Sequence, residues 1–386
     1  MQPVNNRLFF LDNLKVALVC LVVVHHAGQP YGGSGGFWYF QVYERTINLR
    51  AFFAVNASFF MSLFFFISAY FVPASFDKKG PALFLKDRFV RLAPPLLAGG
   101  LIMIPLLMYA YFINFRGYKS ISFWNYYINI YLGFGMKPKG WTGPSWPDLQ
   151  FAHLWFIEHL LIYAVLYCAI RWLLKKRISK KLELNTLSVI MFGVLVASAT
   201  FAIRIQHPIN EWVGFLGFIQ TEFAHVPQYA AFFIAGTLAY RNRWLDSISN
   251  AAGLGWLSAG VILMLLRYGG WVPFLSPGGL NRDSLGYSFY ETFLCLGLSI
   301  GLLYIFRELG NRTNSMARML ARHAFAVYFV HVPVVVGLQY ALAHAPLPTG
   351  LKFVLAAAGG IVLSFLISCG AHQLMRGARS TSRSTP

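Results

Sequence analysis

Long apolar blocks alternate with shorter polar segments along this chain. A membrane-spanning helix needs roughly 20 mostly apolar residues, and windows of that length recur about ten times. We therefore predict spans over residues 12–30, 50–73, 92–113, 151–172, 186–204, 222–240, 252–269, 288–306, 322–342 and 351–374. The segments between these windows are predicted to be loops.

The composition is typical of a membrane protein and excludes a soluble one. Hydrophobic residues make up 57% of the 386 residues and charged residues only 12%, whereas a soluble domain is about half apolar and a quarter charged. So little charge cannot cover the surface of a soluble protein of this size. We therefore predict an all-α, polytopic transmembrane helix bundle, with a single domain over residues 1–375 and a short disordered cytoplasmic tail over 376–386.

Lys and Arg residues give the chain a formal net charge of +19. Most of them lie in the N-terminal segment and in alternate loops, which is the positive-inside pattern of membrane proteins. This pattern predicts that both termini are cytoplasmic and that the chain contacts membrane lipid, and it argues against nucleic-acid binding. The four cysteines lie in apolar runs without metal-ligand spacing, so no metal site is expected. The oligomeric state is left open.

The first span carries two ionisable residues on one face. Its sequence is RLFFLDNLKVALVCLVVVHHAGQPY, over residues 7–31. The step from Lys15 to His26 corresponds to a rise of ~16 Å and leaves only ~20° of rotation about a helix, whereas His25 lies ~80° away from Lys15. Because ionisable groups inside a span are costly and often functional, His26 is the strongest catalytic candidate. The structural alternative is an interhelical hydrogen bond.

A second basic feature precedes the predicted third span. In the sequence FLKDRFVRLAPPLL, Arg88 and Arg91 are about one helical turn apart. Two guanidinium groups on one face suit phosphate binding. The alternative is that both side chains anchor the helix at the membrane surface.

Further polar residues of the predicted spans are secondary candidates. Glu158 could orient an imidazole, as carboxylates do in catalytic triads. His153 is placed where an acceptor would arrive, or is simply an interfacial histidine. His331 either serves the site or forms an interhelical hydrogen bond, and Glu291 either lines the entrance for the acceptor or is solvated.

Two predicted external loops, 28–49 and 114–150, are rich in aromatic residues. Flat apolar ring faces can stack on sugar rings. The alternative is that these rings form the aromatic belt found at membrane surfaces.

Several motifs, taken together, resemble those of the acyltransferase type 3 family of integral-membrane acyltransferases. Lys15 and His26 match the family's basic-x10-His pattern. Arg88, Arg91 and Pro94 match its R-x-x-R-x-x-P pattern. Three further segments that resemble family motifs are MSLFFFISAYF from Met61, HLWF at 153–156 and AVYFVHVPV at 326–334. The resemblance covers nearly the whole chain. It is strongest to the branch that acylates periplasmic glucans.

The chain departs from the family pattern at three points. Lys15 replaces the usual arginine, which keeps the charge but loses bidentate geometry. Ala69 replaces the usual glycine after Ser68, which slightly limits the approach of a neighbouring helix. The WSLxxEE motif of some relatives is absent, so the resemblance itself assigns no catalytic role to Glu158.

The resemblance implies a reaction and a location. The donor would be cytoplasmic acyl-CoA (acetyl-CoA or succinyl-CoA) as co-substrate, with no bound cofactor, and the acceptor would be a hydroxyl of an extracytoplasmic carbohydrate at the bacterial inner membrane. His26 would act as a general base or as an acyl-accepting nucleophile, so direct transfer and a covalent acyl relay both remain open.

The implied site residues fall into three groups. The catalytic candidates are His26 and Glu158; the acyl-CoA-binding candidates are Lys15, Ser68, Arg88 and Arg91; and the acceptor-side candidates are His153, Trp155, Glu291 and His331.

A multi-pass transporter of an anionic or acylated solute is the alternative function. Buried lysine, histidine and glutamate residues would then bind the solute. Transporters often consist of two similar halves, and no internal repeat is visible in this sequence.

Overall fold

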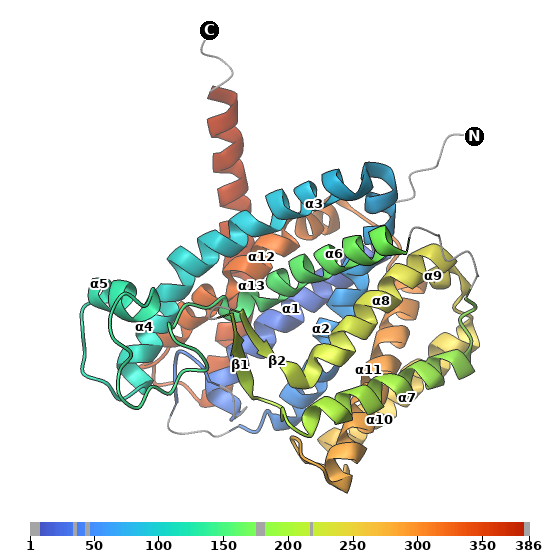
Figure 1. The fold of residues 1–386 in the computed structure, drawn as a ribbon, viewed down its shortest axis with the longest axis horizontal. Coiled ribbons are helices and arrows are strands. Elements are labelled where there is room, and N and C mark those ends of the chain that lie inside the picture. Colours follow the sequence, from blue (N-terminus) through green and yellow to red (C-terminus); the bar gives the residue numbers. More distant parts are fainter. Residues whose placement is uncertain (1–7, 34–36, 43–46, 175–181, 217–218, 382–386) are drawn as a thin grey trace. The chain divides into compact units, whose positions relative to one another are not determined.

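The computed structural model describes residues 8–33, 37–42, 47–174, 182–216 and 219–381 (Figure 1). Among these residues, nine helices are long and apolar enough to cross a membrane. The predicted polytopic helical class is therefore confirmed for the described part of the chain. The residues form two compact units, one of residues 1–53 and 305–386 and the other of residues 54–304. The single domain expected over 1–375 stays a prediction.

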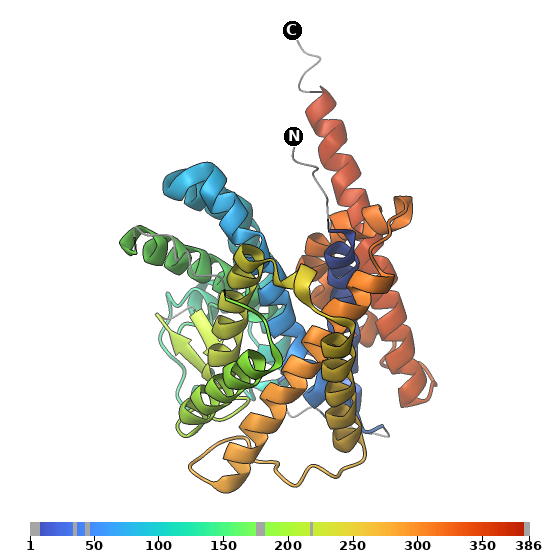
Figure 2. The ribbon, with the colours of Figure 1, turned by 90° about the vertical axis from the view of Figure 1, so that its right-hand side faces the viewer.

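The first unit is built on three long helices, α1 (Phe9–Gly32), α12 (Ser315–Ala341) and α13 (Thr349–Thr381). They pack side by side (Figure 2). A Cβ added at Gly360 of α13 would lie 2.8 Å from the side chain of Val335 and 3.1 Å from that of Val23. The absence of a side chain at Gly360 therefore lets α13 approach both partner helices closely.

The start of α1 is tied to the turn before α12. The Asn13 side-chain amide donates hydrogen bonds to the carbonyls of Gly310, at 2.7 Å, and Arg312, at 2.9 Å. Asn314 caps α12 by accepting a hydrogen bond of 2.8 Å from the backbone N–H of Ala317. These polar contacts set where the two helices begin.

The second unit holds most of the remaining elements. In chain order they are α2 (Arg50–Tyr70, shared with the first unit), α3 (Val72–Ala98), the π-helix η1 (Gly99–Met103), α4 (Ile104–Phe115), α5 (Phe123–Asn125), the π-helix η2 (Tyr126–Tyr131), the 3-10 turn η3 (Ala152–Leu154), α6 (Trp155–Leu173), α7 (Thr186–Arg204), β1 (Trp212–Phe215), β2 (Ile219–Glu222), the 3-10 turn η4 (Phe223–His225), α8 (Val226–Asn242), α9 (Trp244–Ser247), α10 (Asn250–Tyr268) and α11 (Arg282–Leu309, also shared).

Residues 74–91, predicted as a loop, are helical instead. They belong to α3, which kinks at Gly80, where φ is 74° and ψ is 170°. Pro81 follows the kink, and a proline in the first turn of a helix costs no hydrogen bond. The prediction was wrong because a solvent-facing basic helix and a loop have the same low hydropathy. The candidate span accordingly begins at Val72 rather than at residue 92.

The π-helix η1 provides an attachment point for the long loop that follows α4. The Tyr131 hydroxyl lies between the Gly100 and Gln150 carbonyls, 3.1 Å from the latter, and shares its one proton between them. At the base of the loop, Arg116 pairs with Asp148 at 2.8 Å. A π-helical turn displaces backbone carbonyls from the regular ladder, so side chains of the loop can bind them.

The structure differs from the predicted sixth span, 222–240, both in secondary structure and in helix length. Its first residue ends an antiparallel β1–β2 hairpin, which an all-α prediction did not include. The helix that follows, α8, has 17 residues, which is short for a span. Pro227 favours a helix start at this point, and the polar side chains before it bind one another, as described below.

The final helix extends into the segment predicted as a disordered tail. α13 continues to Thr381, so the first part of 376–386 is helical, whereas 382–386 lie outside the described residues. No proline follows Pro348 until Pro386, so nothing in the sequence forces the helix to end at residue 375.

Glycines also bring helices of the second unit together. A Cβ at Gly260 of α10 would lie 2.6 Å from the backbone nitrogen of Leu298 in α11. A Cβ at Gly236 of α8 would lie 2.9 Å from the Cβ of Ala69. Ala69 stands where the family usually has glycine, and Gly236 on the partner helix leaves room for its methyl group.

Candidate active site

The candidate site of the first unit is a pair of imidazoles on α1 and α12. His26 Nδ1 lies 2.8 Å from His331 Nε2, and the two ring centroids are 5.0 Å apart. His331 is fully buried, whereas His26 is half-buried. The two histidines were predicted separately, one as catalytic and the other on the acceptor side, and the structure brings them into contact.

Trp38 and Gln339 surround this histidine pair. The Trp38 ring stacks on His26 with the centroids 5.4 Å apart and the planes 13° apart. Trp38 Nε1 donates to the Gln339 side-chain oxygen at 2.7 Å, and the Gln339 amide nitrogen donates to the Ala27 carbonyl at 3.1 Å. Gln339 therefore ties the Trp38 ring to the end of α1 and holds it parallel to the imidazole.

His25 has a different environment from its neighbour. It is 8% exposed, and its ring packs edge-on against Phe53 with the centroids 5.0 Å apart. Its packing among aromatic rings agrees with the helical geometry that separated it from the Lys15 face. The two adjacent histidines are therefore not equivalent.

Lys15 lies on the same helix as His26, about three turns earlier. Lys15 Nζ pairs with Asp12 at 2.7 Å, and the lysine side chain is 33% exposed. α1 is continuous from Phe9 to Gly32, so the separation of ~16 Å expected along the axis holds in the structure.

The other donor-side candidates lie in the second unit. Arg91 is exposed on α3, and Arg88 is half-buried with its guanidinium 5.1 Å from the centroid of the Phe84 ring. Ser68 is half-buried near the end of α2. The two arginines are one turn apart on a helix, as their spacing predicted.

His153, Trp155 and Glu158 lie together at the start of α6. His153 is buried in η3, and Trp155 stacks on Tyr229 with the centroids 5.3 Å apart. Glu158 is only 4% exposed, and neither of its carboxylate oxygens has a hydrogen-bond partner in the described part of the chain. Glu158 therefore does not orient an imidazole in this structure, contrary to the expectation. The side chain that contacts the His26 imidazole is His331.

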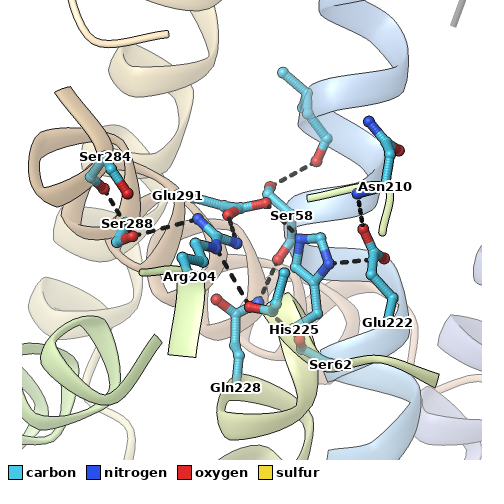
Figure 3. Close-up of polar contacts among 12 residues, drawn as sticks. Ser58, Ser62, Arg204, Asn210, Glu222, His225, Gln228, Ser284, Ser288 and Glu291 are labelled. Atoms are coloured by element: carbon cyan, nitrogen blue, oxygen red, sulfur yellow. Dashed lines mark hydrogen bonds and ion pairs between the residues drawn. The ribbon is translucent and has the colours of Figure 1, made fainter. Parts of the chain in front are cut away.

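Glu291 belongs to a buried ionic network rather than to an open acceptor site. One of its carboxylate oxygens accepts from Arg204 Nη2, and the other faces His225 Nε2 at 3.1 Å (Figure 3). Arg204 is fully buried and also contacts Ser288 at 3.5 Å. The prediction that Glu291 is solvated or accessible to the acceptor is wrong, because both carboxylate oxygens are occupied by cationic side chains.

His225 connects this network to the β-hairpin. Its Nδ1 lies 3.0 Å from Glu222, whose other oxygen accepts from the backbone N–H of Asn210 (Figure 3). His225 lies in η4, outside the nine candidate spans. Burial lowers its pKa, but the carboxylates of Glu222 and Glu291 outweigh burial and raise the pKa to about 9. The cations of Arg204 and His225 thus balance the carboxylates of Glu222 and Glu291.

The aromatic residues of the loop 114–150 divide into buried and exposed rings. Tyr126 and Tyr131 are fully buried, and Tyr126 donates to Asp148 at 2.7 Å. The Trp141 ring lies 4.2 Å from the Arg116 guanidinium, whereas Trp124 is 67% exposed. Most of these rings support the loop, and only an exposed ring such as Trp124 could meet a sugar.

Three residues of these sites were missed in the sequence. Trp38 lay in a loop noted only for its aromatic content, and Gln339 was a polar residue inside an apolar window. Arg204 is the last residue of the predicted span 186–204 and was given no role. A search for every polar side chain within apolar windows would have found Gln339 and Arg204.

Comparison with known proteins gives a family and relatives. Residues 8–370 match the acyltransferase 3 family model, described as an acyltransferase domain. Two similar proteins are the glucans biosynthesis protein C of Shigella dysenteriae serotype 1 (strain Sd197) and that of Escherichia coli (strain K12). Each is 26% identical over 363 residues, which cover 86% of this chain and 83% of the relative. No solved structure matches the chain.

Proposed function

The chain belongs to the acyltransferase type 3 family, and on this basis we propose that it transfers an acetyl or succinyl group from cytoplasmic acyl-CoA to a hydroxyl of an extracytoplasmic glycan. It would do so as a multi-pass protein of a bacterial inner membrane with both termini in the cytoplasm. Membership of the family makes it an acyl-transferring enzyme. The donor, the acyl group and the sidedness are our proposal.

The observation that carries this proposal is the contact between His26 and His331. Acyl transfer to a hydroxyl needs a group that removes the hydroxyl proton as the new bond forms. A half-buried neutral imidazole meets this need, and a second imidazole, 2.8 Å away, holds it in place. The parallel Trp38 ring would stabilise the imidazolium that forms, through a cation–π contact.

In the proposed reaction, the acceptor hydroxyl gives its proton to His26 while its oxygen attacks the thioester carbonyl carbon. A carbon–oxygen bond forms, and the carbon–sulfur bond then breaks. The proton held by His26 passes to the departing sulfur, which leaves as the CoA thiol. His26 returns to its starting state, and no other reactant is needed.

We propose donor-binding cations in each unit, on α1 in the first and on α3 in the second. Lys15, Arg88 and Arg91 carry positive charges that suit the phosphates of CoA. Arg91 is exposed and Lys15 is partly exposed, so each side chain is accessible to an anionic group. The half-buried Ser68 hydroxyl would provide an additional donor-side contact.

The acceptor is proposed from the names of the relatives. Both are glucans biosynthesis proteins, so a glucan is the first acceptor to test. His153 and Trp155, at the start of α6, would contact it, because an aromatic ring can stack on a sugar.

A transfer assay tests the proposal. Membranes that contain the chain are incubated with a glucan and with acetyl-CoA or succinyl-CoA labelled in the acyl group. We expect the label on the glucan and a glucan mass increased by one acyl group. His26→Ala should abolish transfer without lowering the amount of inserted protein. His25→Phe is the matched control, because this neighbouring imidazole already packs against aromatic rings.

Three outcomes would overturn the proposal or part of it. An unchanged glucan mass with both donors, together with uptake of a labelled anionic solute into vesicles, would make the chain a transporter. Full transfer by His26→Ala would remove His26 from the chemistry. An acyl group found on the protein itself by mass spectrometry would replace direct transfer with a covalent relay.

A further inference from the structure

The hydrogen bonds around His331 determine which of its nitrogens carries the proton. His331 Nδ1 lies 2.7 Å from the backbone carbonyl of Tyr328. A carbonyl oxygen can only accept a hydrogen bond, so the proton of this bond belongs to Nδ1. The second nitrogen, Nε2, faces His26.

Burial determines the charge of His331. The residue is 0% exposed and lies inside the hydrophobic helix α12. An imidazolium in such surroundings has lost its hydration, which costs free energy, so the neutral ring is favoured. A neutral imidazole with its proton on Nδ1 has a lone pair on Nε2. His331 Nε2 is therefore a hydrogen-bond acceptor.

The same reasoning then determines the tautomer of His26. Because His331 Nε2 accepts, the bond of 2.8 Å requires a proton on His26 Nδ1. In neutral His26 the lone pair then lies on Nε2. We infer that His331 is a positioning residue that holds His26 in the tautomer whose Nε2 is the base. This inference rests on the proposed function for its catalytic meaning, but not for the tautomer itself.

His331 also assists the proton transfer without taking a proton. When the acceptor hydroxyl gives its proton to His26 Nε2, His26 becomes an imidazolium that still donates from Nδ1 to His331. A hydrogen bond from a charged donor is stronger than one from a neutral donor. The contact therefore becomes more favourable as the reaction proceeds, until the proton passes from Nε2 to the departing sulfur.

Gln339 and Trp38 limit the movement of the His26 ring. An indole N–H can only donate, so the Gln339 oxygen must face Trp38, and its amide nitrogen must face the Ala27 carbonyl. The amide orientation is thus determined on both sides. With the Trp38 ring held parallel to His26, rotation of the imidazole would break the stack as well as the bond to His331.

Two substitutions of His331 separate a positioning role from a packing role. In His331→Gln, the side-chain oxygen can accept from His26 Nδ1 while the amide nitrogen donates to Tyr328. In His331→Met, the volume is kept and both bonds are lost. His323→Met is the matched control, since His323 is a second buried histidine of α12, bonded to Ser368 at 2.8 Å.

We expect His331→Met to lower kcat by about 100-fold, the upper end of the loss seen when the hydrogen-bond partner of a metal-bound histidine is removed. The KM for acyl-CoA should change less than about twofold, because the histidine pair does not bind the donor. His331→Gln should recover kcat to within about tenfold of the natural chain. An equal loss in the glutamine and methionine variants would overturn the inference.

Nitrogen NMR of histidine-labelled protein gives a readout that does not depend on activity. The natural chain and His331→Gln should show His26 protonated on Nδ1, and His331→Met should show a mixture of tautomers. Assignment comes from the signal lost in His26→Ala. If the natural chain transfers no acyl group but shows this tautomer, only the proposed function fails. If it transfers acyl groups with His26 protonated on Nε2, only the positioning role fails.

Discussion

His26 Nδ1 and His331 Nε2 lie 2.8 Å apart, although 305 residues separate them in the chain. Asn13 ties the start of α1 to the turn before α12, and this histidine pair joins the end of α1 to the second half of α12. A hydrogen bond between a half-buried and a fully buried imidazole tolerates little displacement. The imidazole proposed as catalytic is therefore oriented by the packing of the two helices.

Trp38 should contribute to the rate through its ring. Trp38→Leu removes the stack on His26 and the bond to Gln339, and a lost cation–π contact corresponds to about a tenfold lower kcat. Trp38→Phe keeps a ring and should retain more activity. Steady-state transfer rates measure both variants. Phe37→Leu is the control, because Phe37 is an adjacent aromatic residue that is 46% exposed; an equal loss there would mean that only loop folding matters.

Glu158 should make the folded chain less stable. A buried carboxyl without a hydrogen-bond partner destabilises the folded state by about 1–3 kcal/mol. Glu158→Leu should therefore raise the melting temperature in detergent. A carboxyl kept at a cost in stability is typical of a functional residue, so the same variant should lower the rate of transfer. Tyr163→Phe is the control: the Tyr163 hydroxyl is also buried without a partner in the described residues, so its removal should raise stability but spare transfer. A lower melting temperature for Glu158→Leu would indicate that the carboxyl is structural.

Arg91 should act on donor affinity rather than on the chemical step. Arg91→Gln removes an exposed charge from α3, and loss of one charge-assisted phosphate contact should raise the KM for acyl-CoA by about tenfold at unchanged kcat. Arg91→Lys should show a smaller change. Lys86→Gln, an exposed cation on the same helix, is the control. Equal effects of the Arg91 and Lys86 variants would show that only the general positive charge attracts the donor.

The ionic network of His225 should make the protein less stable in alkali. The pKa of His225 is about 9 in the folded chain, against an ordinary value of 6.5. Between pH 6.5 and pH 9 the folded state therefore binds more protons than the unfolded state. The stabilisation from the His225 imidazolium is complete below pH 6.5 and is lost as the pH rises through 9. The loss amounts to roughly 3 kcal/mol. Melting temperatures from pH 6 to pH 10 measure it.

His225→Gln is the control for the pH series. It removes the titrating group, so its melting temperature should be lower at pH 7 and change much less between pH 7 and pH 10. A natural chain whose melting temperature is constant over this interval would show that His225 is not an imidazolium between Glu222 and Glu291.

The sequence by itself determined the class of the protein and the identity of its strongest candidate residues. Apolar windows, low charge and the distribution of Lys and Arg are properties of single segments, so they can be recognised without coordinates. The shared face of Lys15 and His26 also follows from the periodicity of one helix, and the motifs around them were sufficient for the family.

Only the tertiary structure decided which polar residues meet. His331 contacts His26, and Glu291 pairs with Arg204 and His225, because helices distant in the chain pack together. Hydropathy could not distinguish the basic helix α3 from a loop, since both are polar on average. Helical periodicity relates residues a few turns apart, whereas contacts between helices depend on packing that no single segment encodes.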